Sequence, residues 1–60
     1  MLEDKLLTIT ETAKFLNIGV STFRRMITNG DAPIFSKIGK SIRFSYQRIS
    51  EWVEQNEVEI

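Results

Sequence analysis

The side chains best suited to chemistry are cations in the middle of the chain. Between positions 20 and 48 there is a single acid, Asp31, and the net charge of this block is +5. Its cations are Arg24, Arg25, Lys37, Lys40, Arg43 and Arg48. Residues 1–19 sum to −1 and residues 49–60 to −4, so the formal net charge is zero. A basic block between acidic ends can face a polyanion and turn its ends away. The alternative is a solvated surface on which the clustering is chance.

The remaining side chains do not support catalysis or metal binding. The chain has no His and no Cys, which excludes disulfides, zinc sites built on thiolate or imidazole, and any triad that needs either residue. Gly19, Gly30 and Gly39 are isolated in separate turns, so there is no glycine-rich phosphate loop. We therefore expect no catalytic residue, no metal site and no cofactor, and we predict that the protein is not an enzyme.

The length of 60 residues allows one domain over positions 1–60, with a core of about 7–55. A chain this short hides only about 60% of its unfolded surface, so the core must be thin. No apolar run approaches the roughly 20 residues that span a bilayer, and the short acidic N-terminus is unlike a signal peptide. A cytoplasmic protein with no membrane partner is expected.

A short first helix is predicted from Thr8-Ile9-Thr10-Glu11. This pattern is a capping box, in which the Thr8 hydroxyl and the Glu11 carboxylate each accept a backbone N–H. Ile9, Ala13 and Leu16 then fall on one face of a helix that ends near residue 17. About two turns of helix need tertiary packing to be stable.

A second helix is predicted over residues 20–29, with Gly19 as N-cap and Gly30 as the left-handed residue after its end. Its apolar stripe is Val20, Phe23, Met26 and Ile27. Its outward side chains include Ser21, Thr22, Arg24, Arg25 and Thr28. Two short helices joined by a turn around a glycine form a helix-turn-helix unit.

A β-hairpin is predicted after Pro33, over residues 34–38 and 41–44. Gly39-Lys40 fits a two-residue type II′ turn, because glycine comes first. Lys37, Lys40 and Arg43 are expected at the tip and along one edge, as in a wing. The alternative is a charged edge that discourages aggregation.

A last helix is predicted from Tyr46 to about residue 55, with Ser45 as its N-cap. Ile49, Trp52 and Val53 would form its buried stripe, and Trp52 would be the largest piece of the core. The predicted fold class is therefore mainly α with a small β-hairpin. It is a winged helix-turn-helix with a two-stranded wing and a C-terminal helix.

Five segments in this order resemble the small excisionase and AlpA-type DNA-binding domains, which are related to the winged N-terminal domain of MerR regulators. These segments are residues 7–13, 21–27, 29–33, 37–39 with Arg43-Phe44, and 49–52. The sequence departs from the family at Gly19, where a Ser cap is frequent, and at Arg24, where an aromatic is frequent.

The resemblance implies that the second helix enters the major groove of double-stranded DNA and that the wing lies along the adjacent minor groove or backbone. The candidates for reading bases are Ser21, Thr22, Arg24, Arg25 and Thr28. The candidates for phosphate and wing contacts are Lys37, Lys40, Ser41, Arg43 and Arg48. Arg24 or Arg25 could grip a guanine with two hydrogen bonds while the other holds a phosphate.

Members of the resembled family include recombination directionality factors, which bend attachment-site DNA so that an integrase excises a mobile element. We therefore predict an excisionase whose partners are DNA, a tyrosine or serine integrase, and neighbouring copies of itself. It would be cytoplasmic and associated with the nucleoid when bound. One alternative is a small prophage or island transcription regulator of AlpA type. Another is a protein-interaction module without DNA binding, which a pI of about 6.2 would suit.

Overall fold

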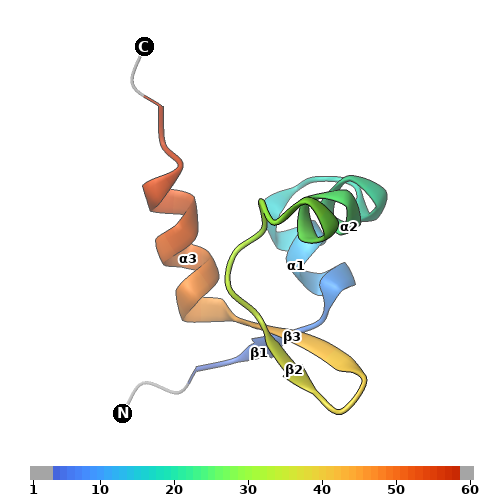
Figure 1. Ribbon diagram of the computed structural model, residues 1–60. Helices are drawn as coiled ribbons and strands as arrows, with labels where there is room; N and C mark the ends of the chain where they lie inside the picture. The colour runs from blue at the N-terminus through green and yellow to red at the C-terminus, as the bar shows by residue number, and fades with distance from the viewer. Residues whose placement is uncertain (1–3, 59–60) are drawn as a thin grey trace.

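The computed structural model describes residues 4–58, which form three helices and a three-stranded antiparallel sheet (Figure 1). The elements are β1 (Leu6–Leu7), α1 (Ile9–Leu16), α2 (Val20–Asn29), β2 (Ser36–Ile38), β3 (Ser41–Ser45) and α3 (Tyr46–Gln55). The β2–β3 hairpin extends to one side, while α3 stands on the other (Figure 1). This arrangement confirms the predicted winged helix-turn-helix. No helix within residues 4–58 is long and apolar enough to cross a membrane.

The predicted capping box starts α1. The Glu11 N–H donates to the Thr8 hydroxyl over 3.0 Å, and the Thr8 N–H donates to the Glu11 carboxylate over 2.9 Å. The helix ends at Leu16 because Asn17 takes the left-handed conformation, with φ of 59°. Its buried side chains, Thr12 and Ala13, anchor this short helix to the core.

The bounds of α2 match the prediction at both ends. Gly19 is the N-cap and supplies no side-chain hydrogen bond. Gly30 has φ of 80°, a conformation that glycine adopts without strain, and its N–H donates to the Ile27 carbonyl. The sequence around these two glycines therefore determines the length of the helix.

The sheet contains a strand that the sequence did not predict. Its order is β1-β3-β2, with Leu6 opposite Ser45 and Leu7 opposite Phe44. Two residues are too few to show the alternation that marks a strand. Immediately before β1, the Lys5 carbonyl accepts from the Tyr46 N–H over 2.8 Å. The N-terminal segment is thereby joined to the start of α3.

Five apolar side chains form the buried core, and aromatic contacts join it to α2 and the wing. They are Leu7, Ala13, Phe23, Phe44 and Ile49. Phe44 of β3 contacts Phe23 of α2, with 5.1 Å between ring centroids, and Phe35 before β2, with 5.5 Å.

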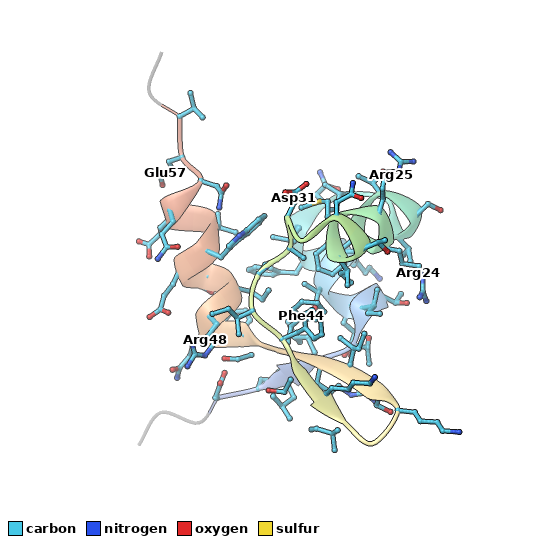
Figure 2. All side chains as sticks on the ribbon, in the orientation of Figure 1. Arg24, Arg25, Asp31, Phe44, Arg48 and Glu57 are labelled. Atoms are coloured by element: carbon cyan, nitrogen blue, oxygen red, sulfur yellow. The ribbon has the colours of Figure 1, made fainter. Side chains whose placement is uncertain are left out.

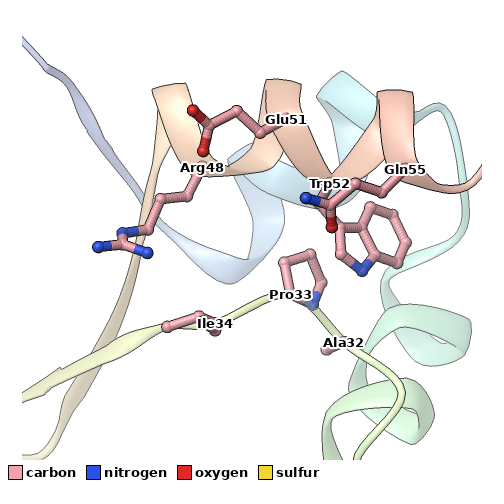
Figure 3. Close-up of a pocket in the computed structure, with 7 residues that line it drawn as sticks. All are labelled: Ala32, Pro33, Ile34, Arg48, Glu51, Trp52 and Gln55. Carbon is pink, nitrogen blue, oxygen red and sulfur yellow. The ribbon is translucent and has the colours of Figure 1, made fainter.

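The prediction that Trp52 is the largest piece of the core is wrong. Trp52 is half-buried and lies outside the core cluster, and Val53 is 41% exposed. Of the predicted stripe on α3, Ile49 is the residue that reaches the core. Trp52 lies one turn further along and lines a small cavity with Ala32 and Pro33 (Figure 3).

Candidate nucleic-acid interface

The outward face of α2 presents every candidate for reading bases to solvent. Phe23 is fully buried, and at 100° per residue Arg25 lies almost directly opposite it. Exposed on this side of the helix are Ser21, Thr22, Arg24, Arg25 and Thr28. The buried stripe of α2 therefore sets which side chains can meet a ligand.

The two arginines of α2 project in different directions. In Figure 2, Arg24 lies on the side of α2 toward the hairpin, whereas Arg25 projects away from the hairpin. None of the side-chain hydrogen bonds found within residues 4–58 uses either guanidinium group. Both cations are therefore available to a ligand, but at different parts of its surface.

The hydroxyl groups on α2 differ in their freedom to bind. The Thr28 hydroxyl donates to the Arg24 carbonyl over 3.1 Å, so its proton is used within the helix. The hydroxyls of Ser21 and Thr22, in the first turn, take part in none of the hydrogen bonds found within residues 4–58. The N-terminal half of α2 thus offers the free polar groups, and Thr28 is limited to accepting.

The hairpin has the predicted two-residue turn. Gly39 has φ of 61°, and Lys40 is not among the residues with positive φ, which agrees with a type II′ turn. Ile38 pairs with Ser41 across the turn. Lys40 and Ser41 are exposed at this tip.

The cations of the two wing strands lie on opposite faces of the sheet. Lys37 is opposite Ile42, and Arg43 is opposite Ser36. Because side chains alternate along a strand, Lys37 and Ile42 share the face of Phe44, against which α2 packs. Arg43 lies on the reverse face, is half-buried, and donates to the Ile42 carbonyl over 2.8 Å. Lys37 therefore faces the same side as α2, and Arg43 does not.

Arg48 lies apart from the other candidates. It is exposed on α3, on the opposite side of the molecule from Arg24 and Arg25 in Figure 2. It lines the cavity of Trp52 and Pro33, together with Glu51 and three other residues (Figure 3). The structure does not bring Arg48 to the side of α2.

Lys14 is a cation near α2 that the sequence did not single out. It is exposed on α1 and lines a hollow with Asn17, Gly19 and Val20, beside the uncapped first turn of α2. The charge distribution along the sequence did not point to Lys14, because it lies in the N-terminal block, whose charges nearly cancel. Its closeness to α2 comes from the turn between the helices.

Two carboxylates, Asp4 and Glu11, have lowered pKa values because hydrogen bonds at the start of a helix stabilise the charged form of each. Hydrogen bonds from the Ser45 hydroxyl and the Gln47 N–H lower the pKa of Asp4, although burial opposes them. Hydrogen bonding by Thr8 lowers the pKa of Glu11, with smaller help from the charges of Lys5 and Arg43. Both groups stabilise helix N-termini. Within residues 4–58 no group of three or more acids, His or Cys could hold a metal.

The comparison with protein families agrees with this geometry. The family model described as "Helix-turn-helix domain" matches residues 6–57, which includes every helix and strand of the structure. No curated protein and no solved structure gives a significant match. Since the matched residues span nearly the whole chain, this protein belongs to the helix-turn-helix domain family, a family of small DNA-binding domains.

Proposed function

We propose that the protein is an excisionase, which binds attachment-site DNA and bends it to direct an integrase toward excision. The observation that supports DNA recognition best is the free outward face of α2, with Lys37 of the wing on the face of the sheet against which α2 packs. A ten-residue helix is about 15 Å long, and the major groove is about 12 Å wide. The N-terminal half of α2 can therefore reach base edges while the wing lies on the backbone.

Arg25 and Arg24 have different roles in this proposal. Arg25 is opposite the buried Phe23, so it enters the groove most deeply and contacts a base edge, with guanine the best match for its two parallel donors. Arg24 lies on the flank toward the hairpin (Figure 2) and holds a phosphate, as does Lys37. This division is our proposal for the choice between the two arginines that the sequence leaves open.

Several copies are proposed to bind side by side. A single module of this size contacts few base pairs, so its affinity alone is modest. Glu57 is on the opposite side of the molecule from Arg24 and Arg25 (Figure 2). The acidic C-terminal block of one copy can therefore attract a basic block of the next while α2 stays on DNA. The copies would act in the cytoplasm, on the nucleoid when bound.

Footprinting on DNA from the attachment region of the element that encodes the protein tests this proposal. We expect several adjacent protected sites, bent DNA in a circular-permutation assay, and excision by the integrase only when the protein is present. If about four cations meet phosphates, the logarithm of the DNA-binding constant should fall with the logarithm of the salt concentration with a slope of about −3 to −4.

An AlpA-type transcription regulator would use the same surface and would protect a promoter instead. Protection at a promoter, with no effect on excision, would support that alternative. No DNA binding even at low salt would overturn both roles and favour a protein-interaction module.

A further inference from the structure

An apolar groove lies between α1 and α3, on a part of the surface that the DNA-binding proposal does not use. Both helices pack against β3, and their facing sides leave a hollow of about 310 Å³. The hollow is lined by Phe15, Leu16, Ser50 and Val53. We call it the α1–α3 groove.

Two of the apolar side chains that line the α1–α3 groove are exposed, and an exposed aromatic ring lies beside it. Phe15 is 46% exposed and Val53 41%, and the neighbouring Tyr46 is 43% exposed. The rings of Phe15 and Tyr46 meet edge to face with 5.3 Å between centroids, which joins the two helices beside the groove. Exposed apolar side chains that line one groove offer a surface that an apolar side chain of a partner could cover.

Ser50 has the smallest side chain of the residues that line the groove, and its hydroxyl proton is already used in a hydrogen bond. Its small side chain lies between Tyr46 and Val53 on α3. Its hydroxyl donates to the Tyr46 carbonyl over 3.1 Å. An apolar side chain could therefore fill the space over Ser50 without burying an unpaired proton.

An acidic side chain borders the groove on α3. Glu54 follows Ser50 by four residues, so the two share a face of that helix. The cation of α3, Arg48, lines the separate cavity of Trp52. Lys14, on α1, lines the hollow beside Gly19.

We propose that the α1–α3 groove docks an amphipathic helix of a partner protein that carries Lys or Arg beside its apolar face. Such a helix would insert one apolar side chain over Ser50 and pair a cation with Glu54. A second copy paired symmetrically would bring the two acidic borders together, which is unfavourable. The proposal goes beyond DNA binding and does not depend on it.

The first test uses a synthetic helical peptide with Leu on one face and Lys on the other, titrated into the isotopically labelled full chain. We expect NMR shifts concentrated at Phe15, Ser50 and Val53. Ser50→Leu fills the hollow and should weaken peptide binding about tenfold, the loss typical of one well-packed anchor. Gln55→Leu, which adds a similar side chain beside the cavity of Trp52, should leave binding unchanged.

The second test concerns charge. Glu54→Lys should weaken binding of the Leu/Lys peptide more than Glu51→Lys, because Glu51 faces the cavity of Trp52. A matching peptide of Leu and Glu should bind more weakly than the Leu/Lys peptide. Equal binding of the two peptides, or shifts that spread evenly over the surface, would overturn the proposal.

Sedimentation of the chain without peptide tests whether a second copy of the chain, rather than a partner helix, occupies the groove. Self-association that Ser50→Leu abolishes would show that a second copy covers the groove, and would also overturn the proposal. DNA affinity should be the same for Ser50→Leu and the parent chain. A failure of DNA binding in both proteins would count against the proposed function and leave the result for the groove standing.

Discussion

Phe23 of α2 and Phe44 of β3 meet ring against ring, with 5.1 Å between centroids and 50° between planes, and both side chains are fully buried. This contact fixes the position of α2 relative to the wing. The residues that would contact DNA are at the surface, but their relative placement depends on this buried pair.

Phe44→Ala is expected to remove most of the protein's free energy of unfolding. Removing a buried Phe typically costs about 3–5 kcal/mol, and the whole free energy of unfolding of a small domain is about 5 kcal/mol or somewhat more. Denaturant titration followed by circular dichroism measures the change. Phe35→Ala is the matched control, because Phe35 contacts Phe44 but is 38% exposed. A similar loss for both variants would contradict this account of the core.

Gly19→Ser is expected to stabilise the protein by a few tenths of a kcal/mol. The N-cap has an extended backbone with φ of −67°, and a new Cβ meets only an ordinary contact, 3.8 Å from the Thr22 hydroxyl. The serine hydroxyl can accept a free N–H of the first turn of α2. Thermal melting measures the gain.

Gly30→Ser, unlike Gly19→Ser, is expected to destabilise the protein. Space is available around Gly30, but its φ of 80° strains any residue with a side chain. That backbone cost is about 1 kcal/mol. A stabilised Gly30→Ser variant would show that the end of α2 is not held in the left-handed conformation.

Asp4 should make stability depend on pH in the acid range. Its pKa in the folded protein is below the ordinary value of 3.8, first because of the hydrogen bond from Ser45. The stabilisation is therefore fully present above pH 3.8 and is lost as the pH falls through the lowered folded value. Asp4→Asn should melt at a lower temperature than the parent chain at pH 7, and the difference should shrink below pH 3.8. A difference that stays constant with pH would rule out the carboxylate as its source.

Arg25→Ala and Arg24→Ala should weaken DNA binding in different ways. Loss of a base contact by Arg25 should cost about 1–3 kcal/mol and relax the preference at one base pair. Loss of a phosphate contact by Arg24 should weaken binding to all sequences and make the salt slope less steep by about one. Gel-shift titrations on the target site and on single-base variants distinguish the two. Arg48→Ala is the control and should change neither property.

Neutralising the acidic tail should reduce cooperativity without changing affinity for one site. We expect Glu57→Gln combined with Glu59→Gln to bind a single-site fragment as the parent does and a multi-site fragment with a less steep isotherm. Deletion of residues 55–60 should act in the same direction. Unchanged steepness in both variants would exclude the tail as the contact between neighbouring copies.

Local signals in the sequence predicted the helices and the hairpin turn well. Thr8 with Glu11, Gly19 with Gly30, and Gly39 each act through neighbours within a few residues, so their effect can be read without the fold. The outward face of α2 follows in the same way, because Phe23 and Arg25 are separated by a fixed angle on the helix.

Features that depend on contacts between distant segments were missed. The pairing of β1 with β3 joins residues almost 40 positions apart, and neither Leu6 nor Leu7 signals it alone. The faces of Lys37 and Arg43 depend on the strand register, so the sequence could place both cations on the wing but not on opposite sides of it. Trp52 lay on a good helical stripe, but only the tertiary packing shows that the core ends at Ile49.

Trp52 is the single tryptophan of the chain, and its half-buried place beside Pro33 makes it a native fluorophore for one part of the molecule. None of the α2 cations lines its cavity (Figure 3). Its emission should therefore shift to longer wavelength when α3 separates from residues 32–34, and stay constant when a ligand covers α2. Spectroscopy on the unmodified chain can thus follow folding and occupancy as two independent signals.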